Sequence, residues 1–131
     1  HELIEPALVE GTWVVCDRFT DATFAYQGAG RGLPAELIEQ MEVIVQGSIR
    51  PDLTLIFDIQ AHLGLERASQ RSNPDRFERE EIEFFNRARE CYLARASAFP
   101  NRCKLIDASQ SISQVQSELN DLLRDFVVSR K

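Results

Sequence analysis

An acid–base pair, Asp17 and Arg18, follows directly after the apolar run TWVVC, and the glycine-rich turn GAGRG (28–32) comes shortly afterwards. The guanidinium group of an arginine presents a rigid fork of N–H donors that fits two phosphate oxygens at once. We therefore interpret the pair as part of a site for a phosphorylated ligand.

Further arginines stand in the glycine-rich turn, at helix ends and in the segment ERASQRSNPDRFERE (66–80). They are Arg31, Arg67, Arg71 and Arg76. The residues SNP interrupt this segment and predict a break between two helices. Such a loop could bring positive charge over a phosphorylated ligand, or it could be a solvated loop with salt bridges. Arg79 and Arg87 stand among acids on the next helix, and this pattern predicts surface ion pairs for both.

The segment FAYQGAGRG combines rings, an amide and glycines. Tyr26 and Gln27 are expected on a short helix, where a ring and an amide could hold a nucleobase or a sugar. The alternative is that Phe24 and Tyr26 pack in the core. The glycines do not match the dinucleotide-binding pattern G-x-G-x-x-G.

Three short apolar runs, at 12–17, 52–59 and 103–108, predict strands that are covered on both faces. Helices are predicted between and after them, at 34–47, 61–70 and 78–99, with a last one that begins near Ser111 or Ser113. This alternation indicates an α/β protein with a parallel sheet. Ligands of such folds bind beyond the carboxyl ends of the strands, where Asp17, Asp58 and Asp107 stand.

The chain length suits one domain, and the cysteine pattern suits a protein in a reducing compartment. The chain has 131 residues and a net charge of −6, which argues against a nucleic-acid-binding protein. The three cysteines, Cys16, Cys91 and Cys103, are odd in number, stand far apart in the sequence and form no C-x-x-C pair, which argues against a disulfide framework or a zinc site. Cys16 stands in an apolar run and is expected to be buried. No apolar run is long enough to span a membrane, and the start of the sequence lacks the apolar stretch of a signal peptide, so we expect a cytoplasmic protein. Neither histidine has the partners of a catalytic triad.

Four segments together resemble the C-terminal two-thirds of bacterial thymidylate kinase, in order and spacing. They are DRFTDATFAYQGAGRGL, PDLTLIFDI, ERASQRSNPDRFERE and LIDASQSI. The resemblance implies an α/β fold of the P-loop nucleoside monophosphate kinase type, with a parallel sheet and helices on both of its faces. It also implies transfer of the γ-phosphoryl group of ATP to dTMP, with Mg²⁺, and a homodimer.

The resemblance assigns roles to residues on the dTMP side. Arg18 is expected to reach the phosphates, and Asp17 to organise the metal indirectly. Thr23 is expected to read the thymine edge, and Tyr26 to pack against the deoxyribose with Gln27 beside it. Ala22 departs from the small polar residue of many relatives, which puts one contact with the base or sugar in doubt.

The resemblance also assigns residues to the ATP side. The segment from about 66 to 80 is expected to be a lid that supplies Arg67, Arg71 and Arg76, with Arg71 stabilising charge on the transferring phosphoryl group. Arg67 and the segment DASQ are expected to line the adenine side. That segment comprises Asp107, Ala108, Ser109 and Gln110.

The phosphate-binding motif G-x-x-x-x-G-K-[ST] does not occur in the sequence. The family resemblance therefore predicts residues 1–131 to be the C-terminal part of a single kinase domain, without its first two strands and inactive alone. Two alternatives remain open at this stage. They are another nucleoside monophosphate kinase, and a non-catalytic remnant that binds nucleotide or a partner subunit.

Overall fold

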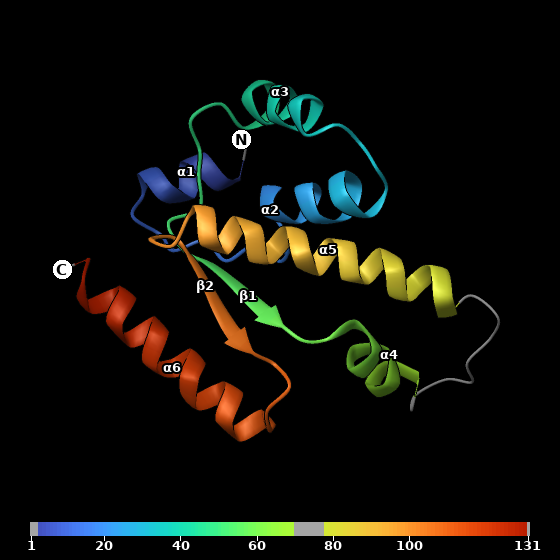
Figure 1. Ribbon diagram of the computed structural model, residues 1–131. Helices are drawn as coiled ribbons and strands as arrows, with labels where there is room; N and C mark the ends of the chain where they lie inside the picture. Colours follow the sequence, from blue (N-terminus) through green and yellow to red (C-terminus); the bar gives the residue numbers. More distant parts are fainter. Residues whose placement is uncertain (1–2, 70–77, 131) are drawn as a thin grey trace.

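A computed structural model describes residues 3–69 and 78–130, and Figure 1 shows how the elements are arranged. The order is α1 (Ile4–Val9), α2 (Thr20–Thr23), the π-helix η1 (Phe24–Gly30), α3 (Ala35–Gln46), β1 (Thr54–Asp58), α4 (Ala61–Ser69), α5 (Glu78–Ala98), β2 (Cys103–Asp107) and α6 (Ile112–Val128). None of the helices in these two ranges is long and apolar enough to cross a membrane.

The strands β1 and β2 form a parallel pair in which Thr54 aligns with Cys103 and Asp58 with Asp107. Helix α5 covers one face of this pair, where its Ala96 and Tyr92 pack with Ile56 and Cys103. Helix α6 packs against β2 on the opposite side (Figure 1). The predicted parallel sheet with helices on both faces is confirmed.

The predicted strand at 12–17 is wrong: this segment has no regular secondary structure. A strand needs a neighbouring backbone to pair with, and the sheet within the described ranges consists of β1 and β2 alone. Val15 is consequently 96% exposed, and Cys16 is exposed where we expected it to be buried. The ring of Trp13 is packed edge-on against Phe126 of α6, at 5.8 Å between centroids.

The predicted helices are confirmed within a residue or two of their ends, and local signals explain why. Pro34 precedes α3, and Gly47 ends it with a φ of 58°, a conformation that costs glycine little. Ser111 caps α6 through a reciprocal pair of bonds with Gln114. These signals act within one turn of a helix, so they can be recognised in the sequence.

Candidate functional site

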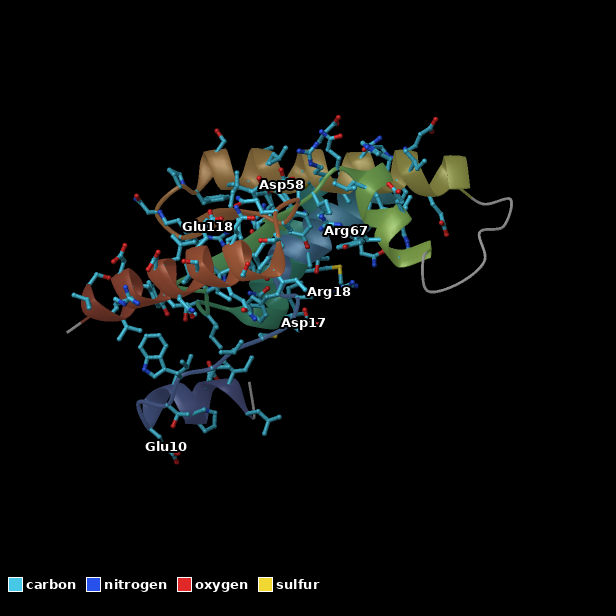
Figure 2. All side chains as sticks on the ribbon, turned by 90° about the horizontal axis from the view of Figure 1, so that it is seen from below. Glu10, Asp17, Arg18, Asp58, Arg67 and Glu118 are labelled. Carbon is cyan, nitrogen blue, oxygen red and sulfur yellow. The ribbon has the colours of Figure 1, made fainter. Side chains whose placement is uncertain are left out.

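The pair Asp17–Arg18 lies exposed in the loop that leads into α2 (Figure 2). Arg18 has a φ of 63°, which is uncommon for a residue with a side chain and indicates local backbone strain. Its guanidinium carbon lies 4.8 Å from the centre of the Tyr26 ring. The structure thus brings together two residues that sequence reasoning assigned to one nucleotide.

Tyr26 lies on η1 and is half-buried, with its ring among other rings. The ring centroids of Phe84 and Tyr92 on α5 lie at 5.9 and 6.2 Å. Burial and the neighbouring Tyr26 raise the pKa of Tyr92 to about 12, so Tyr92 stays neutral at ordinary pH. The ring packs on Phe84 and Tyr92 of α5, as the core-packing alternative has it. Binding of a nucleotide by Tyr26 stays a prediction.

Thr23 and Gln27 are both exposed near Tyr26, Thr23 at the end of α2 and Gln27 on η1. Gln27 accepts a hydrogen bond from Arg31 Nη1 at 3.3 Å. Ala22, the position that departs from many relatives, is 8% exposed. Its methyl group is therefore on the buried side of α2.

The far end of η1 is fixed by α5. Arg87 donates from Nε to the carbonyl oxygen of Ala29 at 3.1 Å and from Nη2 to that of Gly30 at 2.9 Å. Arg87 was predicted to form a surface ion pair, and the structure shows these backbone bonds instead. Gly30 also lies against Phe84, where an added Cβ would come within 2.5 Å of the ring.

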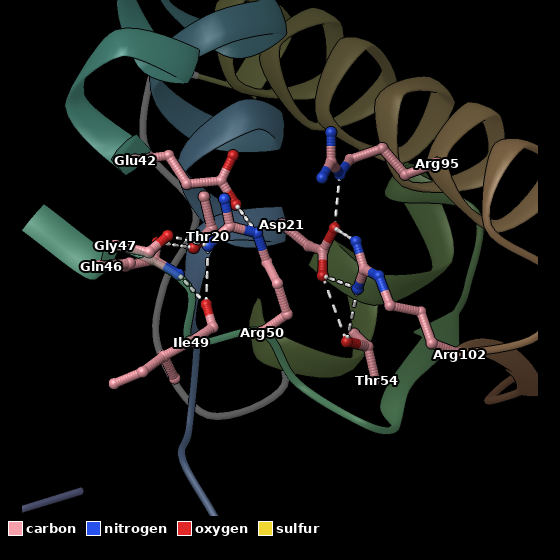
Figure 3. A network of polar contacts seen from close by, with 10 residues as sticks. All are labelled: Thr20, Asp21, Glu42, Gln46, Gly47, Ile49, Arg50, Thr54, Arg95 and Arg102. Atoms are coloured by element: carbon pink, nitrogen blue, oxygen red, sulfur yellow. Dashed lines mark hydrogen bonds and ion pairs between the residues drawn. The ribbon is translucent and has the colours of Figure 1, made fainter. Parts of the chain in front are cut away.

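Helix α2, which leads directly into η1, is fixed in place by the buried carboxylate of Asp21 (Figure 3). Arg102 donates to both of its oxygens at 2.6 and 2.9 Å, and Arg95 donates to Oδ1. Thr54, the first residue of β1, donates to Oδ2 at 3.1 Å. Burial alone would raise the pKa of Asp21, but the two arginines outweigh burial and lower it to about 2.

Thr20 extends this network by donating to the side chain of Gln46 at the end of α3 (Figure 3). The segment that carries the Asp17–Arg18 pair into η1 is therefore joined to α3, β1 and α5. Its position relative to the sheet follows from these contacts.

A second group of predicted residues meets between α4 and the β2–α6 loop. Arg67, marked in Figure 2, donates from Nη1 to the carbonyl oxygen of Ala108 and from Nη2 to that of Ser109, both at 2.7 Å. Asp107 accepts from the backbone N–H and the hydroxyl group of Ser109, and from Gln110. These bonds lower the pKa of Asp107.

The remaining predicted residues are placed as follows. Arg71 and Arg76 lie outside the described residues. Asp58 accepts two bonds from Arg89 of α5, at 2.6 and 2.9 Å, so this carboxylate is engaged in a structural ion pair. His62 is exposed on α4, as expected of a solvated residue.

Sequence reasoning missed Arg87 and the partners of Asp21. One signal was present: Arg95 follows Ala88 and Tyr92 at helical spacing, so it lies on the face of α5 that packs inward. A charge on such a face needs a buried partner. The sequence contains no comparable signal for Arg87, because its partners are backbone carbonyl groups.

A family model described as thymidylate kinase matches residues 1–119. The chain belongs to the thymidylate kinase family. Thymidylate kinase of Teredinibacter turnerae is 52% identical over 127 residues, which are 97% of this chain and 62% of the relative. Thymidylate kinase of Paraburkholderia phytofirmans is 54% identical over 122 residues, or 93% of this chain and 59% of the relative.

A solved thymidylate kinase has the same fold. The crystal structure of the Ehrlichia chaffeensis enzyme superposes with a TM-score of 0.71 at 31% identity, covering 94% of this chain and 55% of that one. The resemblance inferred from the sequence is confirmed, as is its α/β kinase fold. The chain spans about 60% of the length of the curated thymidylate kinases that it matches.

Proposed function

We propose that this chain carries the dTMP side and the lid side of a thymidylate kinase site, which transfers the γ-phosphoryl group of ATP to dTMP to give dTDP and ADP. The observation that carries the proposal is the guanidinium group of Arg18 on the Tyr26 ring, directly after Asp17. This contact places a phosphate-binding fork beside a ring that could pack on a sugar, as a nucleoside monophosphate requires.

On the dTMP side, Arg18 binds the phosphate oxygens and compensates the charge that develops during transfer. Tyr26 packs against the deoxyribose, Gln27 lies beside it, and Thr23 reads the edge of the thymine base. Tyr26 is supported from behind by Phe84 and Tyr92, so its ring is held in place before the nucleotide arrives.

On the ATP side, Arg67 and the segment from Asp107 to Gln110 form a wall for the adenine. The support is that Arg67 binds the backbone of this segment directly. Arg71 and Arg76 belong to the lid, and Arg71 supplies positive charge to the transferring phosphoryl group. The loop that cradles the β- and γ-phosphates of such kinases is not among these 131 residues.

The residues present fit a magnesium ion held mainly by the nucleotide. Mg²⁺ keeps several water ligands and takes one or two carboxylates together with substrate phosphates. The described residues include no cluster of three or more potential ligands, but the carboxylate of Asp17 is exposed next to Arg18. Asp17 would hold the ion through water, and the bound ion would neutralise phosphate charge. Cytoplasmic location remains a prediction from the sequence, and homodimer formation remains a prediction from the family resemblance.

A substrate panel tests the proposal. The full-length natural protein is assayed for ATP-dependent phosphorylation of dTMP, dUMP, CMP and AMP, with product detection by chromatography. We expect the highest kcat/KM for dTMP. A clear preference for CMP or AMP would contradict the proposal and favour another nucleoside monophosphate kinase.

A further inference from the structure

Helix η1 ends at Gly30, and the chain then turns sharply into Leu33 and Pro34. The N–H groups of Gly32 and Leu33 fold back to the carbonyl oxygens of Gly28 and Gln27, at 2.6 and 2.9 Å. The last carbonyl groups of a helix have no partner within the helix and must be satisfied from outside.

Arg87 satisfies the carbonyl groups of Ala29 and Gly30 from another element. Its fork donates to both, at 3.1 and 2.9 Å, from α5, which lies far along the sequence from η1. Phe84 lies one turn earlier on α5, and its ring fills the place where a side chain at position 30 would begin. Arg87 and Phe84 therefore fix the position of the end of η1 along the axis of α5.

The two residues of η1 that face the proposed nucleotide lie within one turn of this end. Tyr26 is held against Phe84, the same residue that contacts Gly30. The backbone carbonyl oxygen of Gln27 accepts the hydrogen bond from Leu33 N–H that closes the turn. A sideways shift or rotation of the end of η1 would therefore move both side chains. A positional error of about 1 Å in binding groups is enough to cost a large factor in function.

We propose that Arg87 is a positioning residue for dTMP: through its two bonds to the end of η1 it sets where Tyr26 and Gln27 stand. This inference rests on the proposed function. Arg87 itself touches neither the nucleotide nor the reacting phosphoryl group. Its loss should accordingly weaken the binding of dTMP more than it slows the transfer of the phosphoryl group.

The test uses Arg87→Ala and Arg87→Lys in the full-length protein, with Arg124→Ala as the control. Arg124 is exposed on α6, where it pairs with Asp121 of the same helix, and α6 packs against β2. Steady-state kinetics give kcat and KM for dTMP. Hydrogen–deuterium exchange reports separately on the amides of Gly32 and Leu33, which close the turn after η1.

We expect Arg87→Ala to raise KM for dTMP about tenfold and to leave kcat within about threefold, since two hydrogen bonds are lost. The KM of Arg87→Lys for dTMP should lie between those of the native protein and Arg87→Ala, because an ammonium group cannot span both carbonyl groups as the guanidinium fork does. Exchange at Gly32 and Leu33 should become faster in Arg87→Ala, and Arg124→Ala should match the native protein in every measurement.

Faster exchange with an unchanged KM would overturn the proposal, because Arg87 would then only stabilise the turn. A native KM in Arg87→Lys would also overturn it, because charge alone would suffice. If the native protein does not phosphorylate dTMP, the proposed function fails. The exchange measurement then still decides whether Arg87 holds η1, since it needs no activity.

Discussion

Arg18 combines a strained backbone with an exposed side chain, and backbone strain of this kind clusters at functional sites. Its guanidinium group lies over the Tyr26 ring, a cation–π contact that favours this position of the side chain. We predict that Arg18→Ala lowers kcat by about 10²-fold, by analogy with the loss of one donor to developing charge. Steady-state kinetics of the full-length protein measure the effect, and ATP affinity should change little.

The matched control for this prediction is Arg124→Ala, which removes an exposed arginine from α6. Equal turnover in Arg18→Ala and the control would refute a role of Arg18 in phosphoryl transfer.

Tyr26 is expected to exclude a ribose 2′-hydroxyl group by the bulk of its ring. We predict that Tyr26→Ala narrows the ratio of kcat/KM between a deoxyribose and a ribose substrate, such as dTMP against its ribonucleotide analogue. Tyr26→Phe keeps the ring and should keep the ratio. The contacts of Tyr26 with Phe84 and Tyr92 would be its whole role if both variants discriminated as well as the native protein does.

The carboxylate of Asp21 makes the free energy of unfolding depend on pH in the acid range. Its pKa in the folded chain is lowered from 3.8 to about 2, so the folded state binds its proton less readily than the unfolded state does. The stabilisation is fully present above pH 4 and is lost as the pH falls through 2. We predict that the free energy of unfolding falls by about 2 kcal/mol more across this window in the native protein than in Asp21→Asn.

Chemical denaturation at several pH values measures this difference, and the comparison of two proteins cancels the other acids, including Asp107. Asp21→Asn should also be less stable at pH 7, because Arg95 and Arg102 lose a buried counter-charge. Parallel pH profiles for the two proteins would show that the Asp21 carboxylate is not the titrating group.

At the scale of elements, the packing of η1 on α5 depends on the absence of a side chain at position 30. A Cβ there would lie 2.5 Å from Cε2 of Phe84, which is closer than any real contact. We predict that Gly30→Ala lowers the free energy of unfolding by about 1–3 kcal/mol, as overpacking does elsewhere, and weakens dTMP binding. Thermal unfolding and calorimetric titration measure the two effects.

Gly64→Ala provides the control. Gly64 lies within α4, where an added Cβ would be 3.5 Å from Ile59, an ordinary contact. Alanine favours helix, so this variant should be about 0.5–1 kcal/mol more stable than the native protein. A Gly30→Ala variant that behaved like Gly64→Ala would contradict the described packing of η1 on Phe84.

Some helices and strands can be predicted from the sequence, and others cannot. Helices α3 and α6 have their own end signals in Pro34, Gly47 and Ser111, and they were predicted almost to the residue. The segment 12–17 has the composition of a strand, but composition cannot supply the neighbouring backbone that a strand must bond to. Local patterns therefore predict helices more securely than they predict membership of a sheet.

For the whole molecule, the residues that resemble thymidylate kinase fall into two groups. One surrounds Arg18 and Tyr26, and the other joins Arg67 to the loop after β2. The family resemblance assigned the members of each group to the same side of the site, and their binding roles stay predictions. The supports behind them, Arg87 and the partners of Asp21, depend on contacts between distant segments that only the fold reveals.

The central claim is that this chain holds the dTMP and lid sides of a thymidylate kinase. The most direct measurement is dTDP formation from dTMP and ATP by a chimera. In it, the part of Teredinibacter turnerae thymidylate kinase that this chain does not match precedes residues 1–131, and the 131 residues alone serve as the comparison. We predict dTDP formation by the chimera, its loss in the chimera with Arg18→Ala, and none by residues 1–131 alone. A folded chimera without activity, or full activity of the 131 residues alone, would contradict the claim.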